Sequence, residues 1–113
     1  MPALVFVNPL KPGKLDEYKA FMAEFTGPRL GEYVDLLRRY GLKSSKVYYH
    51  RVADKEFVIV MHEAEDGARE RLSKWNTSAH PFDIWFRTQL AVLHDLEDAG
   101  LAEAILDFVV PTE

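Results

Sequence analysis

A phenol and an imidazole stand two residues apart in the run KVYYHRV, at Tyr48 and His50. Side chains two residues apart on a strand share one face, and this pair of groups can move protons or bind an oxygenated ligand. Tyr48 and His50 are therefore candidate catalytic residues. The commoner alternative is that both are interface residues whose hydrogen bonds are satisfied.

A third candidate is His80, which stands directly before Pro81 in the stretch SAHPFDIWF. Proline suits the first position of a helix and an acid near the third, so His80, Pro81 and Asp83 predict a helix start. A second interpretation keeps His80 as a neutral acid/base group lining a cleft, with Trp85 and Phe86 as its apolar wall. His50 has no such local duty, so it is the better candidate for ligand contact.

The remaining histidines and Pro2 give weaker signals. His62 begins HEAED, which lacks the second histidine of a zinc helix, and His94 is expected on a solvated helix flank. With four dispersed histidines, no cysteine and no glycine-rich phosphate loop, we expect no metal and no cofactor. Pro2 would become a secondary amine if Met1 were removed, which is the base that tautomerases use.

Composition favours one globular domain over residues 1–113. The formal net charge of −4 argues against a nucleic-acid partner or an anionic membrane surface. No apolar stretch is long enough to span a bilayer, so a cytoplasmic location is the default expectation.

The pattern of apolar residues predicts the order β-α-β-β-α-β. Residues 3–7 form the first strand, and a helical region follows that TGPRL interrupts, giving two helices or one kinked helix in which Thr26 can cap. The runs 46–52 and 55–63 form a hairpin whose turn, Ala53-Asp54, lacks the usual glycine. After a short helix, a second long helix runs from Pro81 to about Asp98, Gly100 ends it, and ILDFVV is the last strand. This is the ferredoxin-like arrangement, an α+β fold with a four-stranded antiparallel sheet and helices on one face.

A two-residue turn would pair His50 with Phe57 and Tyr48 with Ile59. Tyr48, His50, Phe57, Ile59 and Met61 then share one face, while Val47, Tyr49, Arg51, Val58, Val60 and His62 share the face that we expect to meet the helices. The run FVIVM does not alternate, so both faces of its strand should be buried. Helices cover only one face, and a second copy of the chain is the simplest cover for the other. We therefore expect a homodimer in which Phe57 and Met61 join Trp85 and Phe86 as ligand-binding residues.

Four segments carry a resemblance to a known superfamily: LKPGKLDEYKAFM, AED, SAHPFD and ILDF. In their order and spacing the chain resembles the dimeric α/β-barrel superfamily, and within it an uncharacterised bacterial group. The layout is also similar to L-rhamnose mutarotase, but Thr26 stands where that family has its catalytic histidine. The superfamily includes cofactor-free monooxygenases, haem-degrading enzymes and stress-responsive proteins, so the resemblance implies a fold more than a reaction.

Three functional classes follow. The first is a cofactor-independent enzyme acting on a small polar or aromatic molecule in a cleft between sheet and helices, with Tyr48, His50 and His80 as acid/base groups. The second is a non-catalytic small-ligand-binding or stress-responsive dimer. The third is a structural dimer whose own side chains fill the cleft, and a tautomerase using Pro2 is a further alternative.

Overall fold

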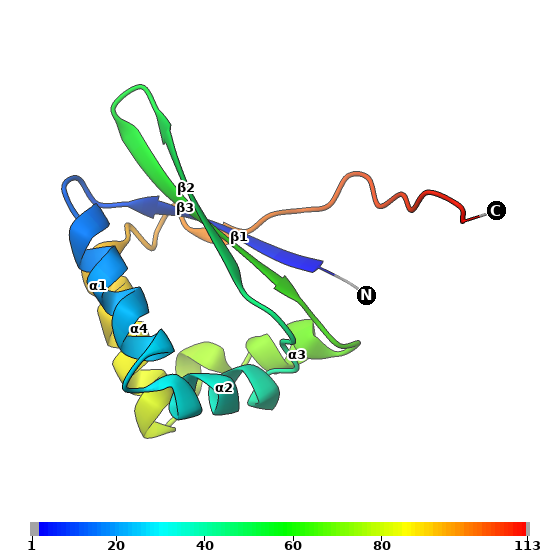
Figure 1. Cartoon of the computed structure of the whole chain (residues 1–113), viewed down its shortest axis with the longest axis horizontal. Coiled ribbons are helices and arrows are strands. Elements are labelled where there is room, and N and C mark those ends of the chain that lie inside the picture. Colours follow the sequence, from blue (N-terminus) through cyan, green and yellow to red (C-terminus); the bar gives the residue numbers. More distant parts are fainter. Residues whose placement is uncertain (1–2, 113) are drawn as a thin grey trace.

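The computed structural model describes residues 3–112 and confirms the ferredoxin-like α+β fold (Figure 1). Its strands are β1 (Ala3–Leu10), β2 (Lys46–Val52), β3 (Lys55–Glu63) and β4 (Gly100–Leu101). Its helices are α1 (Leu15–Thr26), α2 (Leu30–Arg39), α3 (Ala68–Leu72), the short 3₁₀ turn η1 (Trp75–Thr77) and α4 (Pro81–Leu93). All described strand pairs are antiparallel in the order β2-β3-β1-β4, and the helices lie on one side of the sheet.

The predicted hairpin register is confirmed, because His50 pairs with Phe57 and Tyr48 with Ile59. The chain turns at Ala53-Asp54, where Ala53 adopts a φ of 55°. That left-handed region normally favours glycine or asparagine, and a tight hairpin turn requires it. The alternation along both strands is thereby fixed, and with it the identity of the two sheet faces.

The helical region after β1 is two helices. Gly27 and Pro28 occupy the turn between α1 and α2, since proline at an interior position would break the backbone hydrogen-bond ladder. The expectation that Thr26 caps the second helix is wrong. Thr26 is the last residue of α1, and its hydroxyl donates to the Met22 carbonyl at 2.7 Å.

Three expectations for the C-terminal third are wrong. Helix α4 ends at Leu93 instead of near Asp98, and His94 continues in an extended conformation. Gly100 begins β4 instead of ending the helix. The segment ILDFVV, residues 105–110, forms no strand: β4 has only two residues, and the chain beyond it leaves the sheet as an extended tail (Figure 1). The helix was predicted too long because the apolar periodicity continues past its true end. The strand was predicted wrongly because a β-rich composition does not by itself provide a neighbouring strand to pair with.

The core lies between the helices and the sheet face that carries Val58, which we call the inner face. Val58 is 1% exposed, whereas Phe57, Ile59 and Met61, which point to the opposite outer face, are only partly buried. The prediction that the Val47 to His62 face meets the helices is thus confirmed. In the described part of the chain, no helix has the length and apolarity needed to cross a membrane.

Candidate functional site

A cavity of about 310 Å³ lies between the inner face of the sheet and the helices. Aromatic side chains from several elements form much of its wall, among them Phe6, Tyr33, Trp75 and Phe86. Stacked and edge-on contacts hold these rings, such as that of Tyr33 with Phe86 at 6.0 Å between centroids. Among the described residues that line the cavity, none is Asp, Glu, Lys or Arg. The cavity is therefore suited to a small, uncharged and largely apolar molecule.

His62 supplies one polar group in this cavity. It is the second-last residue of β3, it is 8% exposed, and its Nδ1 lies 2.8 Å from the Ser44 carbonyl oxygen. Because a carbonyl only accepts, we assign the ring proton to Nδ1, which leaves Nε2 as an acceptor. Burial lowers the pKa of His62, and the hydrogen bond to Ser44 opposes that shift. The result is an imidazole held neutral.

A hydroxyl chain adjoins the same ring. The Ser45 hydroxyl lies 3.2 Å from Nδ1 of His62 and 2.7 Å from the Tyr33 hydroxyl. Tyr33 also lines the cavity, so His62 and Tyr33 are linked through Ser45. This link fixes the orientation of both rings relative to the cavity.

His94 supplies the second imidazole, and the expectation that it is solvated is wrong, because it is 1% exposed. The helix ends one residue before it, and an isolated antiparallel bridge then pairs His94 with Leu10. Its Nδ1 lies 3.0 Å from the Pro9 carbonyl oxygen, so Nδ1 carries the proton here too. Nε2 is buried without a hydrogen-bond partner within residues 3–112, and the residue lines the cavity. Burial lowers the pKa of His94, opposed by the hydrogen bond to Pro9.

The structure does not bring the sequence-predicted acid/base groups together in this cavity. Tyr48 and His50 lie exposed on the outer face, away from the helices where the predicted cleft would be. His80 is exposed at the start of α4, outside the cavity lining. The expectation that these three residues share one cleft between sheet and helices is therefore wrong. The part that each of them plays in function stays a prediction.

The four predicted ligand-binding residues also separate. Phe86 lines the cavity. Trp85, one residue earlier, packs on Phe82 while the Arg29 guanidinium stacks over its ring at 4.1 Å. Phe57 and Met61 point to the outer face with Tyr48 and His50. Pro2 lies outside the described residues.

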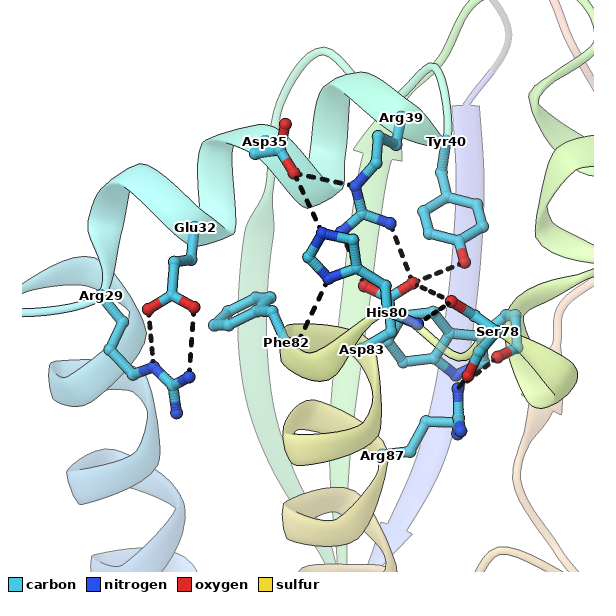
Figure 2. A network of polar contacts seen from close by, with 11 residues as sticks. Arg29, Glu32, Asp35, Arg39, Tyr40, Ser78, His80, Phe82, Asp83 and Arg87 are labelled. Atoms are coloured by element: carbon cyan, nitrogen blue, oxygen red, sulfur yellow. Dashed lines mark hydrogen bonds and ion pairs between the residues drawn. The ribbon is translucent and has the colours of Figure 1, made fainter.

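His80 does start the helix, as one of its two interpretations predicted (Figure 2). Its backbone is extended, with φ −63° and ψ 129°, as proline at the next position requires. Its Nδ1 accepts a hydrogen bond from the Phe82 backbone N–H at 3.2 Å, which satisfies one of the unpaired donors of the first turn. Its Nε2 lies 3.8 Å from the Asp35 carboxylate.

Sequence reasoning missed the network around Asp83, which it treated only as an acid near the helix start. Asp83 is fully buried and accepts two hydrogen bonds from Arg39, at 2.9 and 2.7 Å (Figure 2). It also accepts from the hydroxyls of Tyr40 at 2.8 Å and Ser78 at 2.7 Å. Burial by itself raises the pKa of Asp83. The hydrogen bonds from Arg39, Ser78 and Tyr40 lower it by a larger amount, so the pKa falls to about 2. The network joins α2 to the start of α4, and Tyr40 continues from it into the cavity wall.

Within the described part of the chain, no three His, Asp or Glu side chains are grouped so as to hold a metal ion. The groups with chemistry in the cavity are therefore its imidazoles, its tyrosine hydroxyls and the amides of Asn8 and Asn76. Sequence reasoning overlooked His62 and His94 because neither has a local partner. The only local signal was that His62 alternates with Val58 and Val60 on the helix-facing side.

The fold and its cavity define the class, a ferredoxin-like α+β protein with an apolar cavity between sheet and helices. Among solved structures, the chain is similar to tetracenomycin F2 cyclase from Streptomyces glaucescens, a type-II polyketide cyclase. The two share 18% identity with a TM-score of 0.68, over 98% of this chain and 100% of the other. At this identity the likeness shows the fold alone. No family model and no curated protein matches the chain, so the resemblance to L-rhamnose mutarotase and to a bacterial group is not confirmed.

Proposed function

We propose that the protein is a cofactor-independent enzyme that acts by proton transfer on a small aromatic molecule in the inner cavity. The observation that carries the proposal is an aromatic, charge-free cavity whose lining includes two buried imidazoles, each with its Nδ1 on a backbone carbonyl and its Nε2 left as an acceptor. The polyketide cyclase that shares the fold supports an aromatic substrate class.

His62 is the residue that we assign as the base. Its Nε2 would accept a proton from a bound ligand, and the Ser44 carbonyl would stabilise the resulting imidazolium through Nδ1. Returning that proton to a second position of the ligand completes a rearrangement without net charge change. A base of lowered pKa is unprotonated at neutral pH, which is the state that the reaction needs.

The ligand should also carry a hydrogen-bond donor. His94 Nε2 is buried and lacks a donor in the described chain, and leaving such an acceptor unpaired costs about 1–3 kcal/mol. Once the side chains that cover this nitrogen move aside, a ligand hydroxyl would supply the missing donor. We expect hydroxylated aromatic molecules to bind more tightly than matched ethers, which have no donor.

Fluorescence titration tests this with 2-naphthol and 2-methoxynaphthalene as probes. The chain has two tryptophans, so Trp85→Phe leaves Trp75, on the cavity wall, as the only indole. We expect 2-naphthol to bind about tenfold more tightly than the ether, the effect of one net hydrogen bond. His94→Phe, in the same background, should remove that preference, whereas the matched control His50→Phe on the outer face should keep it. Equal binding of both probes, or loss of binding only in His50→Phe, would contradict the assignment of the cavity.

A binding protein without turnover is the second candidate, and the absence of a charged catalytic group from the described cavity lining favours it. The two candidates differ in a measurable way. An enzyme should catalyse hydrogen–deuterium exchange at an acidic C–H of a bound keto-aromatic probe, such as 2-tetralone, in D₂O. The exchange rate should exceed the rate in buffer without protein, and His62→Gln should abolish the acceleration. If wild-type protein binds such a probe but adds nothing to the exchange rate, the binding protein is the correct reading.

We further propose a homodimer formed through the outer face of the sheet. Phe57, Ile59 and Met61 are only partly buried there, and Tyr48 is 50% exposed. One chain leaves this apolar face without a cover. Tyr48 and His50 would then be interface residues. Light scattering at micromolar concentration should give twice the monomer mass, and a monomer would contradict the proposal.

The cytoplasmic location expected from the sequence also stays a prediction.

A further inference from the structure

The C-terminal tail, residues 104–112, holds the most exposed large apolar residues of the described chain. Its five large apolar residues are between 70% and 94% exposed: Ile105, Leu106, Phe108, Val109 and Val110. Figure 1 shows the tail running away from both the sheet and the helices. A β-rich, largely apolar run in water is normally a binding element or an aggregation hazard.

The tail has no place beside its own β1. Strand β4 pairs Leu101 with Phe6 and Gly100 with Val7, so each further tail residue moves one step toward the start of β1. In that register Ala104 would meet Ala3, the first residue of β1. Residues 105–110 therefore run beyond the described end of the strand that holds β4. Their apolar side chains need another partner.

The opposite edge of the sheet offers an open partner. Strand β2 is outermost in the order β2-β3-β1-β4, so its outer backbone groups have no strand neighbour among residues 3–112. Exposed apolar and aromatic residues occur on both of its faces: Tyr48 is 50% exposed, Tyr49 42% and Val52 54%. The tail also has apolar residues at consecutive positions, so as a strand it would cover both faces.

The charges of the tail and of β2 are also complementary. Strand β2 carries Lys46 and Arg51 and no acid, whereas the tail region carries Glu103 and Asp107 and no base. Opposite charges on neighbouring strands favour pairing, and like charges oppose it.

The tail cannot easily use its own β2, because β3 and β1 lie between β4 and β2, and it leaves the sheet in another direction (Figure 1). A second copy meets both needs at once, since a two-fold interface is self-complementary. We infer that residues 105–110 of one chain add a strand to the β2 edge of a second copy, and that the second copy returns the exchange. The inference rests on the homodimer proposed above and adds the element that closes it.

Cross-linking tests the contact directly, because the natural chain has no cysteine. Val109→Cys and Tyr49→Cys are prepared as separate single variants, mixed, and treated with a short bismaleimide. We expect a covalent heterodimer from this mixture. The matched control mixes Val109→Cys with Lys19→Cys, an exposed position on α1, and should give much less product. Equal cross-linking of both mixtures would overturn the inference.

Light scattering separates the inference from the dimer itself. The tail variant Phe108→Asp and a chain ending at Glu103 should both shift the dimer toward monomer by at least tenfold in dissociation constant. Thr112→Asp, which adds the same charge beyond the apolar run, should not. If the shortened chain stays as dimeric as wild type, the exchange is wrong while the dimer stands, and if wild type is a monomer, both are wrong.

Discussion

The Asp83 network allows a prediction of acid sensitivity that can be worked out from its contacts. Asp83 is fully buried and accepts four hydrogen bonds, two from Arg39 and one each from Tyr40 and Ser78. Asp83→Asn keeps the shape but removes the charge, and its amide nitrogen faces donors instead of acceptors. Breaking a buried ion pair typically costs 3–5 kcal/mol. Arg39 is 29% exposed and keeps Asp35 as a partner, so we expect a loss of about 2–3 kcal/mol at neutral pH.

The pH dependence follows from the pKa of Asp83. Its pKa is about 2 in the folded chain against 3.8 as the ordinary value, a difference equivalent to about 2 kcal/mol. Because the folded pKa is the lower one, this stability is complete above about pH 5 and is lost as pH falls through about 2. About half of it should be gone at pH 3.

Urea unfolding of wild type and Asp83→Asn at pH 7 and pH 3 measures both effects. The stability gap between the two proteins should narrow by about 1 kcal/mol at the lower pH. The matched control is Asp35→Asn, which removes the other, exposed carboxylate on Arg39 and should cost much less. If Asp83→Asn is as stable as wild type at pH 7, or if the gap stays constant with pH, the assignment of Asp83 as the stabilising anion is refuted.

Three further predictions concern the histidines and the absence of cofactors. His80→Ala should lower stability by about 0.5–2 kcal/mol in thermal unfolding, because it removes the bond to the Phe82 N–H, and an unchanged melting point would contradict the cap. Burial lowers the pKa of both His62 and His94, so protonation favours the unfolded chain and stability should fall as pH drops below about 6.5. His94→Gln should flatten that fall, and identical slopes would refute the point. The purified protein should carry no stoichiometric transition metal and no visible chromophore, which elemental analysis and an absorption spectrum will show.

The sheet could be predicted well where the signal is local. Alternation along two adjacent runs and a two-residue turn fix the pairing of His50 with Phe57, since a slip of one residue would reverse every side chain. The start of α4 could also be predicted from the sequence. Pro81 restricts the backbone conformation of the residue before it, and proline is not tolerated in a helix interior.

Long-range contacts could not be read in the same way. Arg39 and Asp83 are 44 residues apart, and the sequence around either residue does not indicate that the other is its partner. His94 was misplaced for a related reason: Leu93 and Leu96 continue the helical spacing, but the bridge with Leu10 and the bond to the Pro9 carbonyl draw His94 into an extended, buried position. The candidate site depends on such contacts, which is why its histidines were recognised only in the folded chain.

The way the two cavity histidines are held restricts the chemistry that they can do. Each Nδ1 faces a backbone carbonyl, of Ser44 for His62 and of Pro9 for His94, and no carboxylate lies among the described lining residues. A carbonyl orients the ring and partly stabilises an imidazolium, but it does not cancel a full charge in an apolar surrounding. In the reaction proposed above, a proton taken by His62 Nε2 would therefore have to leave again quickly. Such a site suits reactions that move a proton between two positions of one neutral molecule, and it disfavours those that end with a charged product.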